Sequence, residues 1–213
     1  SATVYGNPET VPITEASRLQ VTNPYGRTKL MCEDMLRDLQ ASDPRWQVAI
    51  LRYFNPVGAH ESGLIGEHPS GIPNNLVPYI TQVAVGQREC LSIFGQDYPT
   101  PDGTGVRDYI HVVDLAQGHL AALHYLQTQG QSLTVNLGTG QGVSVKALVD
   151  TFAQVNGVVI PYRFVERRAG DVASLWADTS LAREQLGWTA HKDLECMCLD
   201  AWRWQSGHPQ GYA

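Results

Sequence analysis

The chain has 213 residues, of which 43% are hydrophobic and 17% are charged, and its formal net charge is −6. This composition is typical of a globular protein with a sizeable core and no disordered block. The negative charge and the lack of a basic run exclude a general attraction to nucleic acid. We also expect no membrane-spanning segment and no secretory signal, because no stretch is long and apolar enough.

Cysteine and histidine spacing gives no sign of a metal site. Cys32, Cys90, Cys196 and Cys198 lack the spacing of zinc ligands, and the seven histidines are scattered along the chain. We therefore expect four free thiols and no bound metal, as is usual for a protein in the reducing cytoplasm.

In chain order, helical and extended patterns alternate. The apolar spacing predicts a helix from about Tyr25 to Gln40, and a β-branched run from Val48 predicts a buried strand that ends in polar residues near Asn55. Beyond a long loop, we expect helices near 76–86, 113–127, 145–155, 180–186 and 194–205, and strands from about 91, from about 133 and over 158–165. This alternation indicates an α/β fold.

The expected first helix carries a candidate catalytic pair. Tyr25 and Lys29 are four residues apart, so they lie on one face of the helix, about one turn from each other. A free phenol titrates near pH ~10 and is a poor base at neutral pH, but a neighbouring ammonium favours the phenolate. Tyr25 is therefore a candidate general acid and base supported by Lys29, and Ser1 could relay its proton. Tyr-x-x-x-Lys is also a common chance pattern, so the catalytic interpretation depends on whether other segments agree with it.

Those other segments form an ordered set. They are Ser1–Gly6, Val48–Gly58, Gly71–Tyr79, Leu91–Asp114 and Arg167–Asp171. In this order and spacing they resemble the UDP-glucose 4-epimerases of the extended short-chain dehydrogenase family, over nearly the whole chain. The resemblance implies the remnant of an NAD-binding Rossmann domain over residues 1–57 and a smaller α/β UDP-sugar-binding domain over residues 58–213.

The resemblance also implies a reaction and its residues. The reaction is the reversible inversion of UDP-glucose and UDP-galactose at C4, through a transient 4-keto sugar with bound NAD. Ser1, Tyr25 and Lys29 match the catalytic positions, and the same three residues with Tyr53 match the cofactor contacts. The positions that match nucleotide-sugar contacts are Asn55, Asn75, Leu76, Phe94, Arg107, Arg168, Asp171 and Leu175.

The residue types suit these roles but also have simpler explanations. Arginine binds a diphosphate in bidentate geometry, so Arg107 and Arg168 fit, yet each could equally form a structural ion pair. Asp171 could accept from ribose hydroxyls or pair with Arg168. Asn75 could bind a sugar or cap the helix that follows it. Phe94 could be a core residue.

One position bears on substrate range. Leu175 aligns with the position that carries either a bulky tyrosine or a small cysteine in the resembled family, where the small residue accompanies acceptance of N-acetylated sugars. Leucine is intermediate in size and branched. We expect UDP-glucose and UDP-galactose to be the main pair, with weak activity on the N-acetylated forms.

A second glycine-rich segment imitates a dinucleotide-binding loop. A strand from Leu133 is followed by Gly138-Thr139-Gly140-Gln141-Gly142, a helix, and a second strand that ends at Glu166. This order is that of a dinucleotide-binding βαβ unit with its acidic ribose ligand, but Val143 stands at the third glycine position. We expect the segment to belong to the sugar-binding half, with Ser144 capping the helix.

No convincing dinucleotide-binding loop precedes Tyr25. We therefore expect the catalytic and substrate-binding part of an enzyme, which binds NAD poorly and is inactive by itself. Its Val48 strand is expected to expose apolar surface, which a homodimer would cover or which would cause aggregation.

Two alternatives remain open. A nucleotide-sugar dehydratase or decarboxylase shares Tyr-x-x-x-Lys, but a dehydratase usually has an acidic pair where this chain has Ala2 and Thr3. The chain could also be a UDP-sugar-binding or assembly module without catalysis.

Overall fold

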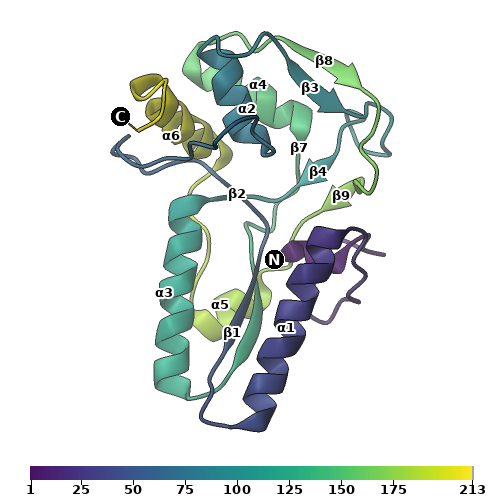
Figure 1. Cartoon of the computed structure of the whole chain (residues 1–213), viewed down its shortest axis with the longest axis vertical. Coiled ribbons are helices and arrows are strands. Elements are labelled where there is room, and N and C mark those ends of the chain that lie inside the picture. Colours follow the sequence, from purple (N-terminus) through teal and green to yellow (C-terminus); the bar gives the residue numbers. More distant parts are fainter. Residues whose placement is uncertain (213) are drawn as a thin grey trace.

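The computed structural model describes residues 1–212. It is an α/β structure with parallel strand pairs, and helices cover those pairs (Figure 1). In the lower part of Figure 1, β1 (Ala49–Tyr53) and β6 (Leu133–Leu137) form a parallel pair flanked by α1 (Pro24–Ser42), α3 (Val112–Gln129) and α5 (Ser180–Leu186). The buried core there consists of Ile110, Leu115, Val135, Leu137, Ala182 and Trp188.

The upper part has its own core. There β3 (Leu91–Phe94) and β8 (Tyr162–Val165) form a parallel pair beside α2 (Leu76–Ala84), α4 (Val145–Asn156) and α6 (Leu194–Gly207). The side chains at its centre include Ile80, Ile93, Leu148, Val149 and Phe152, all almost fully buried.

Short strands join the two parts. β2 (Asn55–Val57) follows β1 directly and pairs in parallel with β5 (Tyr109–His111), which leads into α3. Next to them, β4 (Val106–Arg107) lies between β7 (Val143–Ser144) and β9 (Ser174–Leu175). A 3₁₀ helix, η1 (Ala2–Tyr5), opens the chain beside α1.

The helices begin where their capping residues stand. Asn23 precedes α1, and its side chain accepts from Gly26 N at 2.7 Å, with Pro24 at the first helical position. Ser144 caps α4 by accepting from Ala147 N at 3.0 Å, which confirms its expected role. Every helix expected from apolar spacing is present, with ends shifted by a few residues at most.

Two features of the strands differ from the sequence expectation. The strand expected over 158–165 is shorter and begins at Tyr162, since Ile160 and Pro161 precede it. Five short strands were not expected from the sequence: β2, β4, β5, β7 and β9. A strand of two or three residues is too short to show an alternation of apolar and polar side chains.

The division at residue 57 stays a prediction. However, α3, β6 and α5 come after residue 57 in the chain and still pack in the lower part with β1 (Figure 1). The chain therefore passes between the two parts more than once.

The lower part exposes apolar side chains. On α1, Met31, Met35 and Leu39 are exposed, with Met35 at 70%, and on α3 so are Leu120 and Leu123. Within residues 1–212, β1 pairs with β6 alone, so its other edge carries no strand. No helix in this range combines the length and the apolar character that crossing a bilayer requires.

Candidate active site

The predicted catalytic pair lies at the start of α1. Lys29 Nζ lies 5.2 Å from the centroid of the Tyr25 ring, so the two side chains share a helix face as their spacing predicts. The Tyr25 side chain is 59% exposed among the described residues. Its phenol is thus open to a ligand, with an ammonium beside it.

The first turn of α1 is in close contact with η1. A Cβ atom added at Gly26 would lie 3.1 Å from the carbonyl oxygen of Thr3 and 3.3 Å from its Oγ1. Gly26 follows Tyr25, and Thr3 comes two residues after Ser1. The close approach therefore brings the segment that carries the serine to the helix turn that carries the tyrosine.

Tyr53 is the last residue of β1 and is 37% exposed. Its ring centroid lies 6.0 Å from that of His119 on α3. The residue before it, Arg52, is buried and points to the opposite face of the strand, as alternation along a strand requires.

A cavity of about 430 Å³ gathers most of the predicted nucleotide-sugar positions. Its wall comes from β2, α2, β3, β4 and the loop after β8. The predicted positions that line it are Asn55, Asn75, Leu76, Phe94, Arg107, Arg168 and Asp171. These seven residues come from segments more than a hundred positions apart, so the fold has brought them to one place.

The charged residues of this cavity do not form the ion pair between Asp171 and Arg168 that was the simpler explanation of these residues. Asp171 lies 3.8 Å from Arg107 rather than forming an ion pair with Arg168. The guanidinium carbon of Arg168 lies 4.0 Å from the centroid of the Phe94 ring. Phe94 is therefore a partly exposed wall that holds an arginine in place, not a core residue.

Asn75 has a different partner from the one expected for a helix cap. It occupies the N-cap position of α2, but its side chain makes no capping bond and Nδ2 donates to Glu67 Oε1 at 3.0 Å. The cap explanation for this residue is thus wrong, and Asn75 lines the cavity.

Leu175 does not line the cavity. It lies on β9, opposite Arg107 in the strand register, and its side chain packs against the cluster that contains Ala2, Val4 and Tyr5. Its proposed influence on substrate range stays a prediction.

Sequence reasoning missed several residues of the cavity wall. They are Ile72, Pro73, Asn74, Tyr79, Leu91, Ser92, Ile93, Tyr98, Gly105, Tyr109 and Val145. Tyr109 stands opposite Asn55 in the β2–β5 pair, and burial raises the pKa of its phenol. Since β2 and β5 are too short to be seen in the sequence, no signal placed Tyr109 beside Asn55.

The glycine-rich segment that imitates a dinucleotide-binding loop already holds an anion. The Asp108 carboxylate accepts from Thr139 N at 2.8 Å, Gly140 N at 3.0 Å and Ala177 N at 3.1 Å. Burial raises the pKa of Asp108, although these donors favour its charged form. The following strand, β8, pairs with β3 rather than with β6, so β6, α4 and β8 do not form a βαβ unit.

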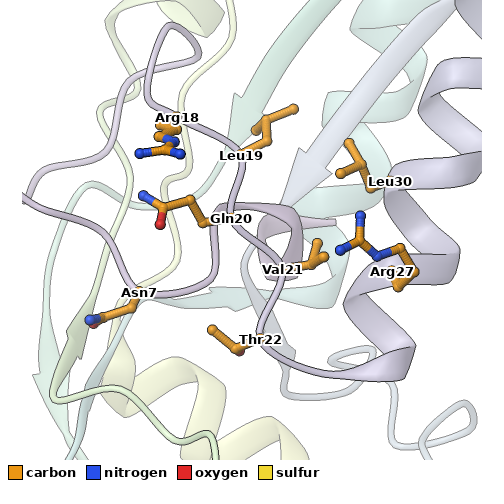
Figure 2. A pocket seen from close by; sticks show the side chains of 8 residues that line it. All are labelled: Asn7, Arg18, Leu19, Gln20, Val21, Thr22, Arg27 and Leu30. Atoms are coloured by element: carbon orange, nitrogen blue, oxygen red, sulfur yellow. The ribbon is translucent and has the colours of Figure 1, made fainter.

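A second cavity, of about 330 Å³, lies beside the start of α1 (Figure 2). It is lined by Asn7, Arg18, Leu19, Gln20, Val21, Thr22, Arg27 and Leu30. At its edge, the backbone of Gly6 lies close to that of Gln20. Gly6 has a φ of 61°, and a Cβ atom there would lie 1.6 Å from the carbonyl oxygen of Gln20, so only glycine fits. None of the predicted site residues lines this cavity.

Within residues 1–212, the fold brings together one cluster with metal-ligating atoms that sequence spacing did not reveal: His111, Cys196 and Asp200. His111 Nδ1 accepts from Val113 N at 3.0 Å, so the ring proton is on Nε2, which donates to Asp200 at 3.2 Å. Burial lowers the pKa of His111, in spite of Asp200. Because the nitrogen that faces the cluster carries the proton, these residues do not fit a metal ion.

Comparison with known proteins gives a consistent result. UDP-glucose 4-epimerase from Bacillus subtilis (strain 168) is 60% identical over 212 residues, which are 100% of this chain and 62% of that protein. The structure of UDP-glucose 4-epimerase from Stenotrophomonas maltophila with bound NAD and formylated UDP-arabinopyranose has a TM-score of 0.96 and 54% identity, covering 99% of this chain and 62% of that one. The structure of UDP-glucose 4-epimerase from Bifidobacterium longum in complex with NAD+ and UDP has a TM-score of 0.95 and 50% identity. The match covers 100% of this chain and 63% of that one.

The chain thus spans about 62% of the length of the curated relatives that it matches. The protein-family model described as GDP-mannose 4,6 dehydratase matches residues 1–201. This chain therefore belongs to that family, and over its whole length it is similar to the UDP-glucose 4-epimerases.

Proposed function

We propose that this chain supplies the catalytic and sugar-binding residues of a UDP-glucose/UDP-galactose 4-epimerase. The observation that carries the proposal is the cavity in which seven predicted nucleotide-sugar positions meet. Its arginines suit a diphosphate, and its asparagines suit hydroxyl groups. The relatives and solved structures that resemble the chain carry the same activity in their names.

The proposed chemistry uses the residues at the start of α1. Tyr25 takes the proton of the sugar C4 hydroxyl, directly or through Ser1, and gives it back from the same phenol. Lys29, whose ammonium lies beside the Tyr25 ring, stabilises the phenolate. Inversion follows because the 4-keto sugar presents its other face before the proton and the hydride return.

NAD fits this set of residues. The exposed phenol of Tyr25 and the ammonium of Lys29 can hydrogen-bond ribose hydroxyls, and the exposed ring of Tyr53 offers a flat apolar surface. When bound, NAD supplies the acceptor for the C4 hydride and the donor that returns it. The comparison structures of epimerases hold NAD or NAD+.

The test is the interconversion of UDP-galactose and UDP-glucose by the full-length gene product with added NAD+. We expect turnover, and we expect Tyr25→Phe to abolish it while Tyr162→Phe, a change to a partly exposed tyrosine outside the cavity, leaves it unchanged. A full-length protein that binds UDP-glucose without converting it would contradict the proposal and favour a binding module.

A dehydratase is the second candidate, because the matching family model carries that description. Near Ser1, however, the chain has a buried Ala2 and Thr3 rather than an acidic pair. Release of a 4-keto-6-deoxy sugar in the same assay would identify a dehydratase, whereas a balanced mixture of the two UDP-hexoses identifies the epimerase.

Substrate range, partners and location complete the proposal. Because Leu175 is intermediate in size, we expect faster turnover of UDP-galactose than of UDP-N-acetylgalactosamine, and equal rates would contradict this.

The exposed apolar faces of α1 and α3 support a homodimer. The four cysteines are free in this structure, which supports a cytoplasmic location.

A further inference from the structure

We propose that a buried ion pair between Glu33 and Arg52, extended by Tyr5, positions the residues that catalyse the proposed reaction. The inference rests on the proposed function. None of the three residues lines the nucleotide-sugar cavity. They would therefore act on the reaction through Ser1, Tyr25 and Lys29 rather than by touching the substrate.

The ion pair is bidentate and almost completely buried. Arg52 Nε donates to Glu33 Oε1 at 3.0 Å, and Arg52 Nη2 donates to Glu33 Oε2 at 2.7 Å. Arg52 is 2% exposed and Glu33 is 4% exposed. Two parallel hydrogen bonds between planar groups fix distance and orientation, unlike a single contact between flexible side chains. The pair thus fixes how α1 lies against β1.

Tyr5 extends the ion pair to η1 and to β6. Arg52 Nη1 donates to Tyr5 Oη at 3.0 Å, and Tyr5 Oη donates to Asn136 Oδ1 at 2.6 Å. The guanidinium carbon of Arg52 also lies 5.0 Å from the centroid of the Tyr5 ring. Asn136 belongs to β6, where its backbone N donates to Glu15 Oε1 at 2.7 Å. Five segments, namely α1, β1, η1, β6 and the loop that carries Glu15, therefore meet in one hydrogen-bonded network.

Each arm of the network stands next to a predicted catalytic or cofactor residue. Glu33 follows Lys29 by one helical turn and so lies on the same side of α1. Arg52 directly precedes Tyr53 on β1, and Tyr5 ends the short helix that follows Ser1. A rotation or slide of α1 against β1 would break the bidentate pair, and a shift of η1 against β1 would break the bond between Arg52 and Tyr5. The network is therefore placed to hold the serine, the tyrosine and the lysine in one arrangement.

Stability alone does not explain an ion pair at this place. Replacing a buried ion pair with packed apolar residues is often neutral or stabilising, because removing two charges from water costs about as much as their attraction returns. An apolar contact, however, tolerates small shifts between helix and strand, whereas this network does not. Displacements of about 1 Å reduce catalysis strongly, so orientation is the property that the network protects.

The test compares Glu33→Gln and Arg52→Lys with wild type in the full-length gene product. Both changes keep the approximate size of the side chain but lose the bidentate pair. We expect kcat, per mole of folded protein, to fall on the order of 10- to 100-fold with the KM for UDP-galactose unchanged. We also expect the acid limb of the pH–rate profile to shift, because the surroundings of Tyr25 change.

Asp200→Asn is the matched control. Asp200 is also a buried carboxylate paired with a cation, but its partners are His111 and Arg203 in a different part of the fold. It should lose stability with kcat and the pH–rate profile intact. If Glu33→Gln behaves like this control, its role is structural and the inference is overturned.

A second readout does not depend on turnover. In the chain with isotope-labelled tyrosine, the NMR resonance of Tyr25, assigned with Tyr25→Phe, should move in Glu33→Gln and stay in place in Asp200→Asn. Wild-type protein without turnover contradicts the proposed function, and the Tyr25 resonance then decides the positioning role. An unmoved resonance in Glu33→Gln overturns the inference.

Discussion

Arg107 supplies a positive charge that is held in place on the cavity wall. Its side chain is 17% exposed, Nη1 donates to the carbonyl oxygen of Val106 at 2.9 Å, and Nη2 lies 3.8 Å from Asp171. A charge held in this way loses little freedom when it binds a diphosphate. We expect Arg107→Met to weaken UDP binding on the order of 10- to 100-fold, as measured by calorimetry, since a charged hydrogen bond contributes about 1.5–3 kcal/mol.

Arg163→Met is the control for this change. Arg163 is an exposed arginine on β8 that does not line the cavity. Its loss removes the same charge from the whole protein and should leave the affinity for UDP within about twofold. Equal losses in the two variants would show that net charge, rather than the position of Arg107, determines binding.

Glu33 gives a pH dependence to folding stability. Burial favours its neutral form, but the hydrogen bonds and charges of Arg52 and Arg37 outweigh burial and lower its pKa below the ordinary value of 4.5. A carboxyl whose folded pKa is depressed stabilises the fold above its unfolded pKa, and this contribution is lost as the pH falls through the folded pKa. We expect the stability difference between wild type and Glu33→Gln in urea denaturation to be fully present well above the ordinary pKa of 4.5 and to shrink as the pH falls below that value.

Asp150→Asn serves as the comparison at each pH. Asp150 forms an exposed ion pair with Lys146 on the surface of α4, and such pairs contribute little to stability. A stability difference for Glu33→Gln that is the same at every pH would contradict the assignment of the acid sensitivity to this carboxylate.

At the scale of elements, Asp108 connects three segments by hydrogen bonds to backbone amides of the loop after β6 and of the segment after β9. Without its carboxylate, the buried amide of Ala177 and the two part-buried amides would lose their acceptor. We expect Asp108→Ala to lower the free energy of unfolding by about 3 kcal/mol in urea denaturation. Asp150→Ala should change it by less than about 0.5 kcal/mol, and similar values for the two variants would contradict the connecting role.

The long elements could be predicted because each contains its own evidence. The helix from Pro24 has a capping asparagine, a proline at its start and regular apolar spacing, and α5 was expected with the bounds that it has. The choice of strand partners is different. Nothing in the local pattern of β8 selects β3 over β6, because the choice is made by the packing of the whole upper core.

The candidate site shows the same distinction. The pairing of Tyr25 with Lys29 follows from helix geometry, so spacing alone predicts it. The cavity positions were identified by resemblance, since no local property of Asn55 or Asp171 requires that they meet. The network of Glu33 and Arg52 was not predicted, because a buried ion pair joins residues whose polar character suggests exposure.

At the scale of the whole molecule, the exposed apolar residues of α1 predict self-association. Met31, Met35 and Leu39 lie on one side of a long helix and are all exposed, and neighbouring exposed apolar side chains are typical of a surface that binds another protein chain. We expect the chain to be dimeric or larger in light scattering after gel filtration. The double change Met35→Lys and Leu39→Lys should shift it toward the monomer, because a partner cannot bury two added charges without cost.

The control replaces an equally exposed apolar residue outside this face. Val159 is 83% exposed and stands between α4 and β8. Val159→Lys should leave the molecular mass in solution unchanged. A wild-type chain that is a monodisperse monomer would contradict the prediction and show that these apolar side chains remain in water.

The carboxylate that occupies the glycine-rich loop has a consequence for how such loops are recognised. A phosphate group that approached Gly138–Gly140 would have to displace Asp108, which is tethered to the same chain and is therefore present at a very high effective concentration. A glycine pattern that follows a strand thus identifies backbone donors but not their acceptor. In related sequences, an aspartate aligned with Asp108 would show that those donors are already engaged within the protein.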